Sequence, residues 1–231
     1  MRLKYRLKEE GFSGVAISPV NHPSVAAKIS ELTSCGIPVV TVNTDINNSN
    51  RLAYVGSDYY KCGKTAGNLM ELITGGQANV GIVTGSDSVL CHSERIAGFK
   101  RYIQKKQCDI RIAGIVENHD DDFESFAVTK KLLEEHPEID ALYLVAAGVY
   151  GAGRAVQSLG LAGRLKIICF DVVPTTKKLI KDGTLAAAID QQPFKQGSLP
   201  LEILSDYLGM GITPVQDAYY TSINIRIREN C

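Results

Sequence analysis

The sequence predicts an α/β fold built on parallel β-sheets. Short apolar runs alternate with longer amphipathic stretches along the whole chain of 231 residues, which is typical of this class. Most of the apolar runs are continuous and do not alternate with polar residues, as in strands that are covered on both faces. Polar residues directly follow several runs, so candidate binding groups are expected at strand ends.

Seven runs are predicted to be strands because they are apolar, short and bounded by turn-forming residues. They are "GVAISP" (14–19), "PVVTVN" (38–43), "ANVGIVTG" (78–85), "IRIAGIVE" (110–117), "ALYLVAAG" (141–148), "LKIICFD" (165–171) and "LAAAID" (185–190).

Five stretches have apolar residues at helical spacing and are predicted to be helices. They cover residues 23–35, 59–73, 93–105, 122–135 and 198–208. The first begins after Asn21-His22-Pro23, which supplies a capping group and a proline suited to the first helical position. The segment Arg2 to Gly11 looks like the end of a helix, whereas a doubly wound domain normally begins with a strand.

The composition is that of an ordinary globular protein, with 45% hydrophobic and 22% charged residues and a formal net charge of zero. Because phosphate backbones are bound by an excess of Lys and Arg, this balance argues against nucleic-acid binding by the chain itself.

The six cysteines show no C-x-x-C spacing, so we expect buried free thiols in a reducing, cytoplasmic compartment. No apolar stretch approaches the length of a membrane span, and "MRLKYRLKEEGFSG" has no apolar leader region. The expectation from these features is a chain that is neither exported nor embedded in a membrane.

Polar residues stand at consecutive strand ends. Asn43 closes "PVVTVN", Ser86 and Asp87 follow "ANVGIVTG", Asp171 closes "LKIICFD", and Gln191 follows "LAAAID". In open parallel sheets ligands bind beyond the carboxyl ends of the strands, so these groups are expected on one surface. Carboxylates accept hydrogen bonds and amides both donate and accept, a set that suits a neutral, hydroxyl-rich ligand such as a sugar.

Three short stretches contain residues that also occur in catalytic, metal-binding or nucleotide-binding motifs. "GFSG" (11–14) lacks the spacing of a nucleophile elbow. "NHDDD" (118–122) is interpreted as an acidic helix N-terminus, and "GVYGAG" (148–153) as glycines for close contact between a strand and the helix that it opens. The prediction is therefore a protein that is not an enzyme and uses no cofactor and no metal.

The order of several segments resembles the type I periplasmic-binding-protein fold. This fold is shared by ribose- and galactose-binding proteins and by the sugar-binding effector domains of lac-repressor-type regulators. The segments that carry the resemblance are "GIPVVTVNTD", "YVGSDYYKCGKTAG", "SERIAGFKRYI", "LYLVAAGVYGAGRAV", "KIICFDVVPTTKKLIKDGTLAAAIDQQPFKQG" and "YYTSINIRIREN". The resemblance implies two doubly wound parallel-sheet lobes with a hinge, joined by three crossings, and a sugar in the cleft.

The resemblance also assigns ligand-binding roles to five residues. Asn43 and Asp45 would bind ring hydroxyls, Arg95 would reach the ring oxygen or a hydroxyl, Asp171 would accept from hydroxyls, and Gln191 would lie near the hinge. Two alternatives remain at this point: Asp171 could cap the helix that follows it, and Arg95 could be an arginine on a helix surface.

The sequence departs from the family pattern in two ways. Ala146-Ala147 stand where many members have an Asn-Asp pair whose asparagine binds sugar. The first strand, first helix and second strand of the family fold would precede Met1, so the N-terminal lobe is expected to be incomplete. The expected division is an N-terminal lobe over 1–108 and a mainly C-terminal lobe over 109–231. The return segment 172–190 forms the hinge region, and the tail crosses back near it.

The predicted function is that of the sugar-sensing domain of a lac-repressor-type transcription regulator, truncated at its N-terminus. The full-length parent would be a homodimer, and it would contact DNA only through a domain absent from this chain. The first alternative is an exported solute-binding protein of a sugar ABC transporter, which would be extracytoplasmic. The second is a doubly wound nucleotide-dependent enzyme, against which the missing phosphate loop argues.

Overall fold

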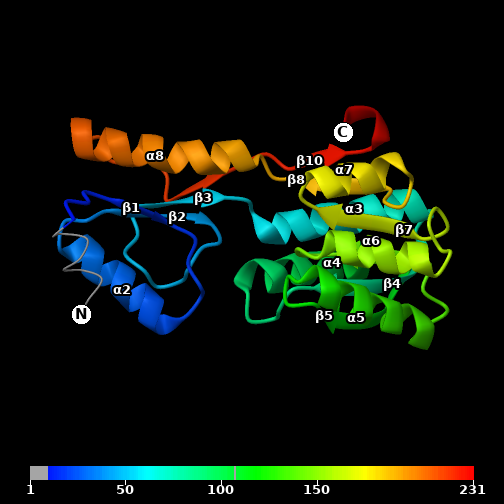
Figure 1. The fold of residues 1–231 in the computed structure, drawn as a ribbon. Coiled ribbons are helices and arrows are strands. Elements are labelled where there is room, and N and C mark those ends of the chain that lie inside the picture. The colour runs from blue at the N-terminus through cyan, green and yellow to red at the C-terminus, as the bar shows by residue number, and fades with distance from the viewer. Residues whose placement is uncertain (1–9, 107) are drawn as a thin grey trace. The chain divides into compact units, whose positions relative to one another are not determined.

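A computed structural model describes residues 10–106 and 108–231. Most of the segment from Arg2 to Gly11, expected to be the end of a helix, lies outside these residues. The chain divides into two compact units. Unit 1 comprises residues 10–58 and 192–222, and unit 2 comprises residues 59–191 and 223–231, with residue 107 not described. Figure 1 shows the elements of both units along the chain.

Unit 1 is a four-stranded parallel sheet with the strand order β1-β2-β3-β9. Its elements are β1 (Val15–Ile17), α2 (Pro23–Ser34), β2 (Val39–Asn43), β3 (Ala53–Gly56), α8 (Pro193–Met210) and β9 (Ala218–Tyr220).

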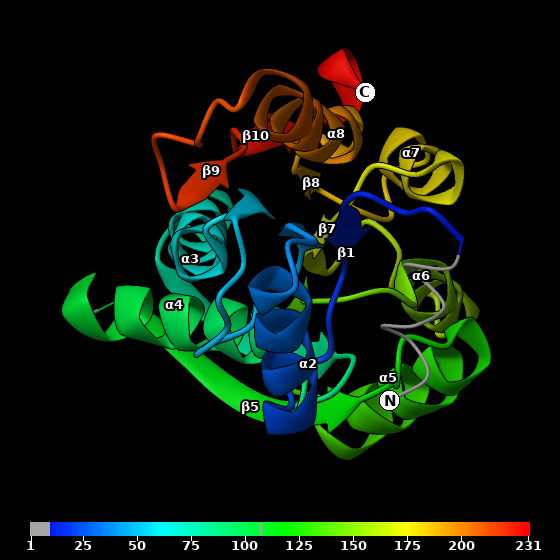
Figure 2. The same ribbon diagram turned by 90° about the vertical axis from the view of Figure 1, so that its left-hand side faces the viewer.

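The two helices of unit 1 cover opposite faces of its sheet, because neighbouring residues of a strand point to opposite sides. Val39 of β2 packs with Ile29 and Leu32 of α2. The next residue, Val40, packs with Ile203 and Leu204 of α8. Figures 1 and 2 show α2 and α8 on the two sides of β1 and β2.

Unit 2 contains a six-stranded sheet with the order β10-β8-β7-β6-β4-β5, in which only the β10–β8 pair is antiparallel. Its elements are α3 (Tyr59–Thr74), β4 (Gln77–Thr84), α4 (Leu90–Lys106), β5 (Asp109–Glu117), α5 (Asp122–Glu135), β6 (Ala141–Leu144), α6 (Val149–Ser158), β7 (Lys166–Phe170), α7 (Pro174–Lys181), β8 (Ala187–Asp190), β10 (Asn224–Arg226) and the short 3₁₀ helix η1 (Arg228–Asn230).

The sheet of unit 2 is covered on both faces, as the continuous apolar runs predict. Tyr143 and Ile168 face α3 and α4, with Met70 and Phe99 in the same cluster. The adjoining residues of β6 and β7 face α5, α6 and α7 in a second cluster. The α/β class, the parallel sheets and all seven predicted strands are therefore confirmed.

The expected lobe boundaries need correction. β4 pairs with β5 on one side and β6 on the other, so α3, β4 and α4 belong to unit 2 although the sequence pattern assigned 1–108 to the first lobe. The chain passes between units at residues 58/59, 191/192 and 222/223. The segment 172–190, expected as a hinge, holds α7 and β8 and lies wholly within unit 2.

One further feature was assigned correctly, and a second, the burial of the cysteines, only in part. "NHDDD" forms the start of α5, where Asp121 is the N-cap and its side chain accepts a hydrogen bond from the Glu124 amide at 2.8 Å. All six cysteines are free thiols, of which Cys62, Cys91 and Cys169 are buried. No helix in the described part of the chain is long and apolar enough to span a membrane.

Candidate ligand-binding site

Arg95 lies near the start of α4 and is almost completely removed from solvent, with 4% of its surface exposed. One terminal guanidinium nitrogen donates to the Val145 carbonyl at 2.6 Å. The other donates to Oε1 of Gln191 at 2.8 Å. The alternative that Arg95 is a surface helix residue is therefore wrong.

Two aromatic rings enclose the guanidinium of Arg95. Its Cζ lies 3.8 Å from the ring centroid of Phe170 and 5.0 Å from that of Tyr59, within the range of cation–π attraction. Its Nε is buried and has no hydrogen-bond partner among the described residues. Because an unsatisfied buried donor costs about 1–3 kcal/mol, a ligand oxygen that accepted from this nitrogen would gain that energy.

Asp171 directly follows β7 and remains exposed to solvent. Its Oδ1 accepts a hydrogen bond from Nε2 of Gln191 at 2.7 Å. The N-cap of α7 is Val173, which makes no side-chain capping bond, so Asp171 does not cap that helix. Gln191 thus joins a buried cation to an exposed carboxylate, and these hydrogen bonds fix the orientation of its amide. We call Arg95, Gln191, Asp171, Phe170 and Tyr59 the Arg95 network.

Left-handed backbone conformations concentrate at the carboxyl ends of strands. Asn43 ends β2 with φ 62°, Asp171 follows β7 with φ 65°, and Gln192 lies two residues beyond β8 with φ 56°. His119 and Asp120, just beyond β5, have φ values of 47° and 61°. Backbone strain of this kind persists where surrounding contacts impose it, and it gathers at functional sites.

The loop after β5 adds buried polar groups in unit 2. Asn118 is 1% exposed, donates to the Ala147 carbonyl at 2.9 Å and accepts from the Asp120 amide at 3.0 Å. Burial lowers the pKa of the neighbouring His92 below its ordinary value, although Asp120 opposes the shift. Within the described ranges, no group of three or more His, Cys, Asp or Glu residues could hold a metal ion.

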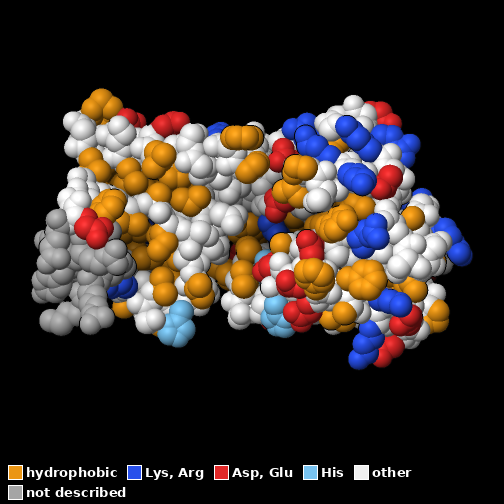
Figure 3. All heavy atoms as spheres, in the orientation of Figure 1, with side chains coloured by type: hydrophobic (Ala, Val, Ile, Leu, Met, Phe, Trp, Pro, Cys, Tyr) orange, Lys and Arg blue, Asp and Glu red, His pale blue; other side chains and the backbone are white. Residues whose placement is uncertain are grey.

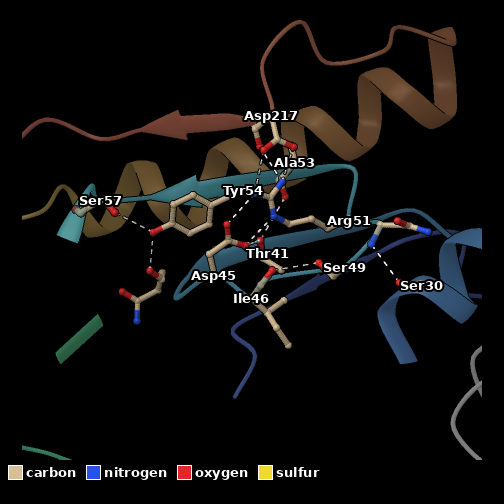
Figure 4. Close-up of polar contacts among 12 residues, drawn as sticks. Ser30, Thr41, Asp45, Ile46, Ser49, Arg51, Ala53, Tyr54, Ser57 and Asp217 are labelled. Atoms are coloured by element: carbon tan, nitrogen blue, oxygen red, sulfur yellow. Dashed lines mark hydrogen bonds and ion pairs between the residues drawn. The ribbon is translucent and has the colours of Figure 1, made fainter. Parts of the chain in front are cut away.

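In unit 1 the structure separates the roles expected for Asn43 and Asp45. Asn43 is exposed at the end of β2, and its carbonyl oxygen lies 2.9 Å from the hydroxyl of Tyr54, which donates to it. Asp45 is held by Arg51, whose Nε and Nη2 each donate at 2.7 Å, and by the hydroxyl of Thr41 at 2.7 Å (Figure 4). This arrangement favours a structural role for Asp45.

Arg95, Asp171 and Gln191 are therefore brought together in unit 2, whereas Asn43 and Asp45 belong to unit 1. Sequence reasoning did not find Phe170, Tyr59 or Asn118. Phe170 directly precedes Asp171 at the end of a predicted buried strand, and this position is the sequence feature that could have indicated its place in the site.

The profile of a family described as "Periplasmic binding protein domain" matches residues 7–211. The chain belongs to this family. The ribose import binding protein RbsB of Salmonella typhimurium is 26% identical over 203 residues, which cover 87% of this chain and 68% of that protein. The D-ribose/D-allose-binding protein of Pseudomonas aeruginosa is 24% identical over 221 residues, covering 93% of this chain and 68% of that protein.

Solved structures show the same fold. GanP, a glucose-galactose binding protein from Geobacillus stearothermophilus, superposes with a TM-score of 0.91 at 27% identity and covers 99% of this chain and 81% of its own. A solute-binding protein of an ABC transporter from Burkholderia graminis, in complex with D-arabinose, gives 0.92 at 26% identity, over 99% of this chain and 80% of its own. A chain of the XylFII-LytSN complex gives 0.90 at 30% identity, over 100% of this chain and 82% of its own.

Proposed function

We propose that this protein binds a neutral sugar and serves as the solute-binding component of a sugar import system. The observation that carries the proposal is the Arg95 network, in which a buried arginine is linked through Gln191 to the exposed carboxylate of Asp171, while its Nε finds no acceptor among the described residues. The relatives named for ribose import and for sugar binding support the same reading.

The chemistry of the network fits a polyhydroxylated ligand. Arg95 supplies a donor, Asp171 supplies charged acceptors, and Phe170 and Tyr59 supply apolar ring surface beside them. Sugars combine hydroxyls with apolar C–H faces. They can therefore accept from the donor, donate to the acceptors and pack against the aromatic rings. The exposed Asp171 would repel a phosphorylated ligand, since like charges disfavour each other at short range.

We propose that Asn43, which ends β2 of unit 1, also contributes to sugar binding. A bound sugar would favour the conformation that binds it best over others by the difference in binding free energy. Recognition of that conformation by a transporter would couple sugar binding to import.

The regulator function predicted from the sequence stays as a second candidate because of one observation. All six cysteines are free thiols, and free thiols are commoner in a reducing cytoplasm than in an oxidising compartment. A sensing role would use the same Arg95 network, so the two candidates differ in location and partner rather than in the binding step. Fractionation of the native host with an antibody against the chain would separate them.

Isothermal titration calorimetry of the whole chain tests the binding step directly. The panel is D-ribose, D-arabinose, D-xylose and D-galactose, with a phosphorylated pentose as the charged comparison. We expect saturable binding of at least one neutral sugar and none of the phosphate. Asp171→Asn should weaken it by about 1–3 kcal/mol, which is roughly fivefold to 150-fold in Kd.

Asp109→Asn is the matched control, because Asp109 is an exposed carboxylate that pairs with Arg111 on the surface of unit 2. Its affinity should equal that of the wild type. A chain that binds none of the sugars, or that binds them equally well after Asp171→Asn, contradicts the proposal.

A further inference from the structure

Arg51 lies at the end of the loop that joins β2 to β3, with only 10% of its side chain exposed. Its guanidinium grips Asp45 with two parallel hydrogen bonds of 2.7 Å each. It also donates to the carboxylate of Asp217 at 2.8 and 3.2 Å and to the Asp217 carbonyl at 2.9 Å. One arginine therefore ties the β2–β3 loop to the residue preceding β9 (Figure 4). We call Arg51, Asp45 and Asp217 the Arg51 clamp.

The charges in the Arg51 clamp explain why it holds. Burial alone would lower the pKa of Arg51, but the hydrogen bonds and charges of Asp45 and Asp217 outweigh burial and raise that pKa above its ordinary value. Bidentate arginine–carboxylate pairs are among the stronger and more directional hydrogen bonds in proteins. A pairing of this kind restricts the position of Asp45 more tightly than a single hydrogen bond would.

Asn43 lies two residues before Asp45 and has a left-handed backbone, with φ 62°. On one side its carbonyl is fixed by the hydroxyl of Tyr54 at 2.9 Å. On the other side the chain runs to Asp45 in the clamp and then to Ile46, which is 3% exposed in the core with α2. The short segment that carries Asn43 is therefore held at both ends, as a strained turn requires.

We infer that Arg51 is a positioning residue for sugar binding. It contacts no proposed ligand group itself; through Asp45 it fixes the backbone from which the Asn43 side chain extends. The inference rests on the proposed function and deepens it, since it names a residue that affects sugar affinity without contacting the sugar. It also explains why Asp45, expected to bind sugar, has its oxygens occupied by Arg51 and Thr41.

Arg51→Lys is the decisive substitution, because lysine keeps the positive charge but lacks the planar fork that grips two carboxylates. We expect this variant to bind the preferred neutral sugar of the panel about tenfold more weakly by calorimetry. Arg111→Lys is the matched control: Arg111 pairs with Asp109 at the surface of unit 2, and 76% of its side chain is exposed. This control should leave affinity unchanged.

A double-mutant cycle separates positioning from general stability. Asn43→Gly removes the side chain while suiting the left-handed backbone. If Arg51 acts through Asn43, Arg51→Lys should weaken binding by less than about twofold in the Asn43→Gly background, compared with about tenfold in the wild type. A role limited to stability would give the same loss in both backgrounds.

Two results overturn the inference while leaving the proposed function intact: equal losses in both backgrounds, or unchanged affinity after Arg51→Lys. Unchanged affinity after Asn43→Gly overturns the inference together with the proposed Asn43 contact, but it leaves sugar binding by the Arg95 network intact. In each of these cases the wild type still binds sugar and Asp171→Asn still weakens it. Failure of the wild type to bind any sugar defeats the proposed function itself, so the two failures are distinguishable.

Discussion

Arg51 of unit 1 and Arg95 of unit 2 are both largely removed from solvent, but their surroundings differ. Arg51 meets two carboxylates, those of Asp45 and Asp217. Arg95 meets a backbone carbonyl, a glutamine amide oxygen and two aromatic rings, and its Nε has no partner in the described part of the chain. The charge of Arg51 is balanced within the fold, whereas we propose that a ligand supplies the acceptor for the Arg95 Nε.

The difference extends to the frameworks that hold the two arginines. In unit 2 helices approach so closely that a Cβ on Gly98 of α4 would lie 2.1 Å from the Tyr60 carbonyl of α3. In unit 1 a Cβ on Gly197 of α8 would meet no atom of the described residues within 4 Å. On the face shown in Figure 3, hydrophobic side chains gather over unit 1, while Lys and Arg gather over unit 2. Unit 2 is therefore expected to be the more rigid framework.

Hydrogen exchange should show the largest difference between the units. β1 has three residues and lies at the edge of its sheet, whereas β6 and β7 are inner strands with buried faces. We expect the amides of 141–144 and 166–170 to exchange at least about 1,000-fold more slowly than those of 14–18, because edges open locally and core strands open only globally. Equally slow exchange of the amides of 14–18 and those of 141–144 and 166–170 would show that the two units do not differ in local stability.

Two glycine substitutions measure the difference in packing. Gly151→Ala would place a Cβ 1.9 Å from the Asp122 carbonyl, so the helices α5 and α6 must separate. This change should lower the free energy of unfolding by about 3 kcal/mol. Gly197→Ala in α8 should raise it by about 0.5–1 kcal/mol through helix propensity.

Urea unfolding followed by circular dichroism gives both values from the same experiment. If Gly151→Ala proves neutral, the close helix contact in unit 2 is wrong. If Gly197→Ala destabilises the chain, the exposed site assigned to it in unit 1 is wrong.

Two buried tyrosines offer a smaller comparison. The Tyr54 hydroxyl of unit 1 lies 2.9 Å from the Asn43 carbonyl and 3.0 Å from that of Ser57. The Tyr143 hydroxyl of unit 2 has no partner within the described residues. Tyr54→Phe should destabilise the chain by about 1–2 kcal/mol, while Tyr143→Phe should be neutral or stabilising by up to about 1 kcal/mol. Unfolding energies of opposite order would show that the hydroxyl partners are misassigned.

Two histidines of unit 2 should titrate on opposite sides of the ordinary value. Burial lowers the pKa of His92, so its contribution to stability is present above about pH 6.5 and declines as the pH falls toward the folded-state pKa. A hydrogen bond from His119 to Glu124 raises the pKa of His119, and its contribution is lost as the pH rises through that pKa. Imidazole resonances followed by NMR from pH 5 to 8 test both directions, and a single shared midpoint would contradict them.

Much of the fold could be predicted from the sequence because continuous apolar runs identify buried strands. β3, β9 and β10 were missed because each has only three or four residues, although the short apolar run Leu52-Ala53-Tyr54-Val55 marks β3 in the sequence. The lobe boundary was misplaced for a different reason. Successive strand–helix units look alike in sequence, and only the pairing of β4 with β6 decides which sheet they join.

The sequence likewise predicted some residues of the candidate site but not the contacts among them. Polarity at strand ends identified Asp171 and Gln191, and the family resemblance added Arg95. Neither could show that Phe170 stacks on Arg95, because that contact joins a helix to a strand about 75 residues further along the chain. Nor could they show that Arg51 donates hydrogen bonds to both carboxylate oxygens of Asp45. Nothing in the sequence indicates which of several nearby carboxylates a given arginine will contact.

We propose that the Nε of Arg95 is a donor for a ligand, whereas the guanidinium of Arg51 is held by Asp45 and Asp217. NMR of arginine ¹⁵Nε–H groups, recorded with and without the sugar that the chain binds best, observes both side chains in one spectrum. We expect the Arg95 Nε–H resonance to shift, and its proton to exchange more slowly with water, when sugar is added, while the Arg51 resonance stays in place. Sugar binding that leaves the Arg95 resonance unchanged, or that shifts Arg51 instead, would contradict it.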